Sequence, residues 1–166
     1  MDDQSPSTAS DEVEVVDLTP SEWYKLVNPI RYTVTFFLFE LFKYLPPRVK
    51  APLYRAFGAD IGERTNLAPH VLVDPFFPGK VSVGDDSIVG WGTKLLTHEA
   101  YTDEWHVGPV RIGDDVTVGH SCSLRPGVTI GDGATVAAHS FVNRDVEPGE
   151  TVGGVPIETL SAPADD

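Results

Sequence analysis

Side chains able to move protons are concentrated in one short segment, between Leu95 and Ile112. An imidazole with a pKa near neutrality can take the proton of a hydroxyl group, which is a poor nucleophile until it loses that proton. The segment therefore indicates general-base chemistry, and the alternative is a solvated loop histidine without a chemical role. Its reactive residues are His98, Glu99, Tyr101, Asp103, Glu104, Trp105 and His106.

Aliphatic residues that recur every six positions define the elements that must carry this segment. A period of six fits neither an α-helix nor a simple strand, but it suits a coil of three short strands with the aliphatic side chains inside. Stacked coils bury a continuous apolar column and pair their backbones in parallel. The pattern therefore predicts an all-β solenoid, with the small residue Cys122 in its core. The inward aliphatic positions are Ile61, Leu67, Val73, Val83, Val89, Leu95, Ile112, Val118, Leu124, Ile130, Val136 and Val142.

The six-residue period is interrupted at three places. Val73 to Val83 contains an insertion with Pro75, Phe76, Phe77 and Pro78, and Val142 to Val152 contains a turn at Pro148 and Gly149. The longest interruption, Leu95 to Ile112, is the segment rich in reactive side chains. Insertions in a solenoid project from one face and commonly carry function.

The rest of the chain divides by composition. Residues 1–20 are predicted to be a disordered acidic tail, 21–57 a helical segment, 58–157 the solenoid domain, and 158–166 a second acidic tail. The apolar run from Tyr32 to Leu45 is shorter than the roughly 20 residues that span a bilayer. One interpretation of the helical segment is a cap on the open solenoid end, formed by Phe36, Phe37, Phe39 and Phe42; the other is peripheral membrane contact through residues 24–55.

The net charge and the cysteine content bear on the partners, the source and the cellular compartment of the protein. The net charge of −13 makes nucleic acid an improbable partner, because phosphates repel such a surface. An acidic, lysine-poor surface favours a halophilic source, where salt screens self-repulsion. A single cysteine, Cys122, excludes an intrachain disulfide and favours the cytoplasm.

A series of motifs over residues 56–157 resembles the hexapeptide-repeat O-acetyltransferases of the maltose and galactoside acetyltransferase type. The matching segments are Thr97-His98-Glu99, Gly108-Pro109-Val110, Ile112-Gly113-Asp114-Asp115-Val116, Pro126-Gly127-Val128-Thr129-Ile130-Gly131-Asp132-Gly133, Asn143-Arg144-Asp145-Val146 and Val152-Gly153-Gly154-Val155-Pro156.

The resemblance implies a left-handed parallel β-helix assembled as a homotrimer, with active sites between subunits. It implies acyl transfer from acetyl-CoA, a co-substrate rather than a permanently bound cofactor, to a hydroxyl of a sugar-like acceptor. His98 would be the general base, with Glu99 or Glu104 orienting its ring, and backbone N–H groups would stabilise the tetrahedral oxyanion.

The family's coenzyme positions map onto Ala137, Ala138, Asn143 and Arg144. Arg144 either meets a coenzyme phosphate or pairs with Asp145. Ile157 and Glu158 stand where the family usually has a small residue and a base, so the outer coenzyme site departs from the pattern. For the acceptor, Trp91, Tyr101 and Trp105 are the candidates, with packing at the trimer contact as the alternative for the two tryptophans.

Two other classes of function compete with acyl transfer. The γ-type carbonic anhydrases share this solenoid and bind zinc through three histidines. Gly119-His120 is present here, but Arg125 stands where the second histidine of that motif is expected, and a guanidinium cannot ligate zinc. His139 could lie near His120 one coil later, so an interfacial metal stays open. The second alternative is a non-catalytic scaffold. Neither the acceptor nor the acyl chain length follows from the sequence.

Overall fold

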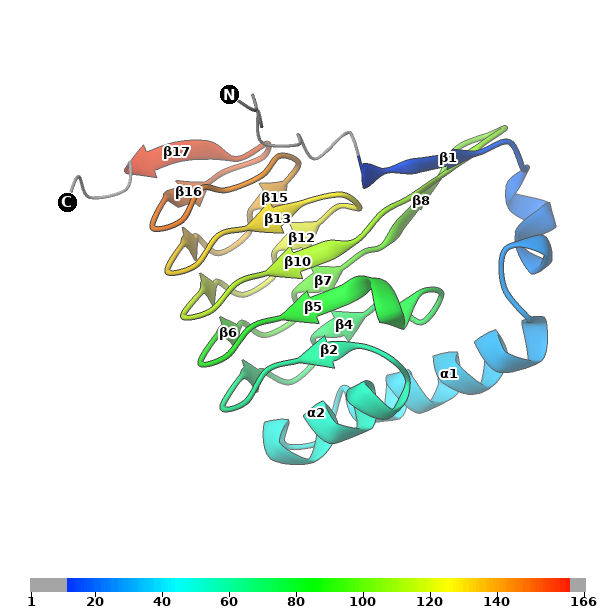
Figure 1. The fold of residues 1–166 in the computed structure, drawn as a ribbon, viewed down its shortest axis with the longest axis horizontal. Coiled ribbons are helices and arrows are strands. Elements are labelled where there is room, and N and C mark those ends of the chain that lie inside the picture. The colour runs from blue at the N-terminus through cyan, green and yellow to red at the C-terminus, as the bar shows by residue number, and fades with distance from the viewer. Residues whose placement is uncertain (1–11, 162–166) are drawn as a thin grey trace, which may run out of the picture.

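Stacked coils of short strands form the body of the protein in a computed structural model that describes residues 12–161 (Figure 1). Three parallel sheets make the three faces of the stack. The first contains β2 (Asp60–Ile61), β5 (Val81–Val83), β10 (Val110–Ile112) and β13 (Thr129–Ile130). The second contains β3 (Asn66–Leu67), β6 (Ile88–Val89), β11 (Thr117–Val118), β14 (Thr135–Val136) and β16 (Thr151–Gly153). The third contains β4 (Leu72–Val73), β7 (Lys94–Leu95), β12 (Ser123–Leu124) and β15 (Phe141–Val142).

The six-residue period places equivalent residues directly above one another. Val83 pairs with Ile61 below it and Ile112 above it, and Ile112 pairs in turn with Ile130. All twelve inward aliphatic positions are buried. Because each coil repeats this register, the side chains form one apolar column along the stack. The predicted parallel solenoid is confirmed.

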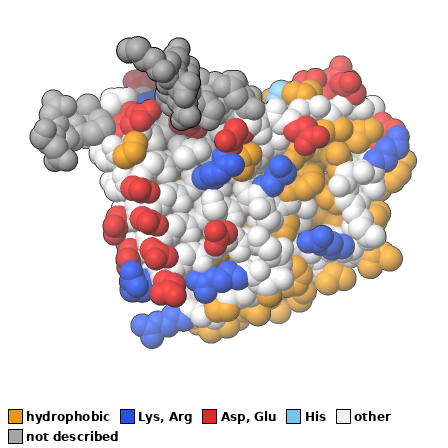
Figure 2. All heavy atoms as spheres, viewed as in Figure 1, with side chains coloured by type: hydrophobic (Ala, Val, Ile, Leu, Met, Phe, Trp, Pro, Cys, Tyr) orange, Lys and Arg blue, Asp and Glu red, His pale blue; other side chains and the backbone are white. Residues whose placement is uncertain are grey.

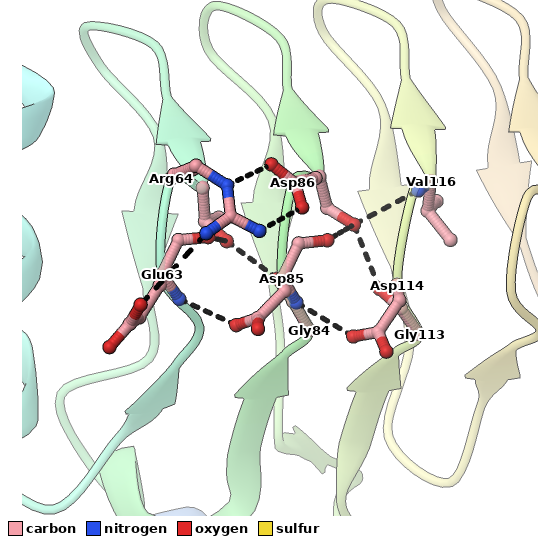
Figure 3. Close-up of polar contacts among 10 residues, drawn as sticks. Glu63, Arg64, Gly84, Asp85, Asp86, Gly113, Asp114 and Val116 are labelled. Atoms are coloured by element: carbon pink, nitrogen blue, oxygen red, sulfur yellow. Dashed lines mark hydrogen bonds and ion pairs between the residues drawn. The ribbon is translucent and has the colours of Figure 1, made fainter.

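Acidic side chains at the first corner connect successive coils (Figure 3). Asp85 Oδ1 accepts a hydrogen bond from the Glu63 backbone N–H at 2.6 Å, and Asp114 Oδ1 accepts one from Asp85 N–H at 2.7 Å. Asp132 continues the ladder by accepting from Asp114 N–H at 2.9 Å. Each carboxylate satisfies a corner amide that the parallel ladder leaves without a partner. Part of the chain's negative charge is therefore structural.

The helical segment closes the open end of the first coil. It consists of the 3-10 helix η2 (Pro20–Lys25), helix α1 (Pro29–Phe42) and helix α2 (Pro47–Ala56), and α2 packs on β2 and β3. Phe39 and Phe42 are buried against Tyr54 within the core, which confirms capping for these two rings.

The opposite side of α1 is exposed to solvent, where Phe36 and Phe37 are 37% and 67% exposed. Hydrophobic side chains gather along this side of the molecule (Figure 2). In the described part of the chain, no helix is both long and apolar enough to cross a membrane. Membrane contact through residues 24–55 stays a prediction.

Parts of both predicted tails are ordered. Strand β1 (Glu14–Val16) pairs antiparallel with β9 (Trp105–Val107), and the Thr19 backbone N–H and hydroxyl both donate to Glu22 at the start of η2. Strand β17 (Glu158–Ser161) pairs antiparallel with β16. The prediction of disorder is wrong for Glu14–Val16, because backbone pairing with the distant strand β9 stabilises a segment whose composition alone does not favour order. Residues 1–11 and 162–166, also assigned to the tails, lie outside the described residues.

Candidate active site

Two of the insertions leave the solenoid at one corner, the one that follows the third sheet. The first lies between β4 and β5 and includes the 3-10 helix η3 (Pro78–Lys80). The second lies between β7 and β10 and forms a hairpin arm of β8 (His98–Ala100) and β9, which extends away from the coils beside β1 (Figure 1). Because β4, β7 and β12 stack in register, the residues that follow them lie in a column.

A buried aspartate in this column holds the His98 ring. His98 Nδ1 lies 2.6 Å from Asp74 Oδ2, and the Asp74 side chain is 1% exposed. The same oxygen accepts from the Thr97 backbone N–H at 2.9 Å and from its hydroxyl at 2.8 Å. The other oxygen accepts from Phe76 N–H at 2.9 Å, so the carboxylate is fixed in place.

This geometry determines which nitrogen of His98 is available. With the Nδ1 proton donated to Asp74, Nε2 carries the free lone pair and acts as the acceptor. Nε2 has no hydrogen-bond partner among residues 12–161, and the side chain is 21% exposed. The pair can therefore take a proton from a group that approaches Nε2.

Aromatic rings enclose the imidazole. Phe76 lies 4.4 Å from the ring of His98, centroid to centroid, and Trp105 stacks on it at 5.4 Å. Trp105 is buried and its indole N–H donates to the Thr19 carbonyl at 3.4 Å. It therefore forms a wall behind His98, and its face is not an open platform for a sugar.

The carboxylates expected to orient His98 have other partners. Glu99 accepts from Arg125 at 2.8 Å and from the Tyr101 hydroxyl at 3.1 Å, while Glu104 pairs with His106 at 2.8 Å. The prediction of Glu99 or Glu104 in this role is wrong, because both side chains serve to brace the arm. Asp74 takes the role. A signal for it is present in the sequence, because Asp74 directly follows Val73, which stacks below Leu95, and the arm that carries His98 begins just after Leu95.

The remaining residues predicted to bind the acceptor are spread over the molecule. Tyr101 is exposed near the tip of the arm, and its hydroxyl donates to the braced Glu99. Trp91 is exposed at the preceding corner, between β6 and β7, where its ring lies 5.1 Å from that of His70. Within one chain, Trp91 is therefore not brought to His98.

The coenzyme positions lie on a later coil. Ala137 and Ala138 follow β14 at the second corner, whereas Asn143 follows β15 at the third. Ala138 and Asn143 are exposed. A single chain thus places the alanines and His98 at different corners of the triangular stack.

Arg144 is held by the protein itself. Its guanidinium donates to Glu150 at 3.0 and 3.3 Å, to the Asp145 carbonyl at 2.8 Å and to the Thr159 hydroxyl at 3.0 Å. The carboxylate that pairs with Arg144 is therefore the buried Glu150. Of the two alternatives for Arg144, the ion pair with Asp145 is wrong, because Asp145 offers only its backbone carbonyl. The bonds with Arg144 lower the pKa of Glu150 to about 2.

Replacing Arg144 with glutamine is expected to destabilise the fold by about 1–3 kcal/mol at pH 7. Since the pKa of Glu150 lies below its ordinary value, the pair contributes fully above about pH 5, and the contribution is lost as the pH falls towards 2. Urea unfolding at several pH values should therefore show the difference between variant and wild type shrinking with acid. Arg111→Gln, which loses only an exposed pair with Glu12, is the control. A difference that does not change with pH would contradict the assignment.

Two further reactive groups lie away from the His98 site. The rings of His120 and His139 are 4.6 Å apart, as the spacing suggested, but the described residues contain no cluster of three side chains suited to a metal. An interfacial metal stays untested. Cys122 is buried in the core and burial raises the pKa of its thiol, which does not suit a nucleophile.

Stacked six-residue coils with a histidine-bearing arm define the class of hexapeptide-repeat transferases. The family described as "Bacterial transferase hexapeptide (six repeats)" matches residues 109–144. The "Putative acetyltransferase YvoF" of Bacillus subtilis is 38% identical over 139 residues, which cover 82% of this chain and 81% of that protein. The galactoside O-acetyltransferase of Escherichia coli is 29% identical over 68% of this chain and 59% of its own length.

A solved structure agrees with these relatives. The hexapeptide-repeat acetyltransferase VCA0836 of Vibrio cholerae, in complex with acetyl coenzyme A, superimposes with a TM-score of 0.60 at 33% identity, over 65% of this chain and 62% of that one. The chain belongs to the hexapeptide-repeat acetyltransferase family, and the predicted membership is confirmed.

Proposed function

We propose that the protein transfers an acetyl group from acetyl-CoA to a hydroxyl of a sugar-like acceptor, with His98 as the general base. The observation that carries the proposal is the Asp74–His98 pair, which leaves Nε2 open. A bound acetyl coenzyme A in the Vibrio cholerae relative supports the donor, and the galactoside O-acetyltransferase relative supports the acceptor class.

The reaction follows from this geometry. Nε2 takes the hydroxyl proton while the oxygen attacks the thioester carbonyl, and Asp74 stabilises the imidazolium that forms. Backbone N–H groups of the coils stabilise the oxyanion. The carbon–sulfur bond then breaks, and the coenzyme sulfur takes the proton from His98. The products are an O-acetyl ester and free coenzyme A, with no acyl-enzyme.

The assembly in this proposal is a homotrimer of left-handed coils with the active site between subunits. The separation of Ala137 and Ala138 from His98 supports it, because the second corner of a neighbouring subunit can approach the third corner of this one. The acidic ladder is exposed and supports a halophilic source, and the single buried cysteine supports the cytoplasm.

Replacing Asp74 with asparagine is expected to lower kcat by about 10²–10⁴-fold with little change in KM for acetyl-CoA. The amide preserves shape, but it favours the wrong tautomer of His98 and does not stabilise the imidazolium. Thiol release at saturating substrates measures the effect, and the pH profile of kcat/KM should shift as well. Glu104→Gln, which touches His106 and not His98, is the matched control. Wild-type turnover by Asp74→Asn would contradict the role of the pair.

A further inference from the structure

A pocket of about 350 Å³ lies between the start of α1 and the Pro75–Lys80 insertion. Its volume falls within the roughly 300–1,000 Å³ range of small-molecule sites. One side comes from residues Leu26 to Tyr32 of the helical segment, and the other comes from the insertion that also carries Asp74 at its base. No residue of the family motifs contributes to it.

The pocket shares a wall with the Asp74–His98 pair. Phe76 lines the pocket, and its ring also lies 4.4 Å from His98. Tyr32 lines the pocket and lies 4.3 Å from Phe76, ring to ring. Burial and the nearby negative charge of Asp74 raise the pKa of the Tyr32 phenol. A molecule held here would therefore contact the same ring that packs against His98.

Two cations line this pocket without a protein partner. Arg31 projects from α1 and Lys80 from the insertion, and neither side chain has a hydrogen bond or ion pair within residues 12–161. Most other cations are engaged: Arg64 with Asp86, Arg125 with Glu99 and Arg144 with Glu150. None of the lining residues is a carboxylate, although the chain carries a net charge of −13. Two free cations facing one pocket are the arrangement that binds an anion.

We infer that this pocket binds a carboxylate or phosphate on the acceptor, so that the protein acts on an anionic hydroxyl compound and not on a neutral sugar. The inference rests on the proposed function. Arg31 and Lys80 would hold the anionic group, while the rest of the acceptor packs along Tyr32 and Phe76 towards Nε2 of His98. Coenzyme A also carries phosphates, so the test must separate the two sources.

The inference is tested by isothermal titration calorimetry. The full-length protein is titrated with inorganic phosphate at constant ionic strength. The dissociation constant is expected to rise at least tenfold in the Arg31→Ala/Lys80→Ala double variant. The constant should stay unchanged in the Lys94→Ala control. Lys94 is exposed and has no ion-pair partner in residues 12–161, but it lies outside the pocket. Saturating coenzyme A should leave phosphate binding intact in the wild type.

Two results would overturn the inference. Equal phosphate binding by the double variant and the wild type would remove the site, and displacement of phosphate by coenzyme A would assign the pocket to the coenzyme. Unfolding midpoints of the variants check that they are folded. Because binding is measured without turnover, phosphate binding should persist in a His98→Ala protein. Failure of this test and failure of the proposed reaction are therefore distinguishable.

Discussion

Replacing His98 with alanine is expected to lower kcat by at least 10²-fold while the solenoid stays folded. A positioned general base contributes about 10²–10⁴-fold, and the hydroxyl has no other proton acceptor in the described site. The side chain lies on the arm outside the apolar column, so its loss leaves the coils intact. Steady-state thiol release measures kcat, and KM for acetyl-CoA should change little because His98 acts on the acceptor.

His106→Ala provides the matched control for this variant. His106 lies on β9 of the same arm and pairs with Glu104 at 2.8 Å. Within residues 12–161 its side chain makes no hydrogen bond or ion pair with Asp74 or His98. Its removal should change kcat only a few-fold. Equal loss of activity in the two variants would indicate damage to the arm. That result would contradict the assignment of His98 as the general base.

Replacing Gly84 with alanine is expected to destabilise the fold by about 3 kcal/mol, the upper end of the usual cost of overpacking. A Cβ at this position would lie 2.2 Å from Asp114 Oδ1 and 2.6 Å from the Gly113 carbonyl carbon and oxygen. The parallel ladder between β5 and β10 fixes the spacing of these coils, so the backbone cannot move aside. The methyl group would also displace the carboxylate that accepts from Asp85 N–H (Figure 3).

Urea unfolding compares this variant with Gly79→Ala. At Gly79 a Cβ would meet only the Gly58 carbonyl at 3.5 Å, an ordinary contact, so the free energy of unfolding should change by less than about 1 kcal/mol. Similar stability of the two variants would contradict the view that glycine sets the close stacking of the coils at this corner.

The solenoid could be predicted from sequence because its signal is periodic. Each inward residue is tied to its equivalents above and below, so positions such as Val89 and Leu124 follow from counting alone. The Asp74–His98 pair could not be predicted in this way. Its members are 24 residues apart, and the insertions hide the fact that Val73 and Leu95 are stacked neighbours.

The helical segment shows a second limit of prediction from sequence. Helix α1 carries large apolar residues on both its covered and its exposed sides, so its sequence does not reveal which rings face the coils. Phe39 and Phe42 lie on the covered side, whereas Phe37 lies on the exposed one. Strand β1 was not predicted for a related reason. Its partner β9 is about ninety residues away in the sequence, and the local composition of residues 14–16 does not indicate that pairing.

A single-turnover reaction with isotope-labelled acetyl-CoA tests the central claim most directly. Excess wild-type protein is mixed with the labelled donor and a set of neutral and phosphorylated hexoses, and the label is followed by mass spectrometry. The label should pass from the thioester to an acceptor hydroxyl, never appear on the protein, and move at least 10²-fold more slowly with His98→Ala. Label on the protein, or equal transfer rates for the wild type and His98→Ala, would contradict direct transfer with His98 as the base.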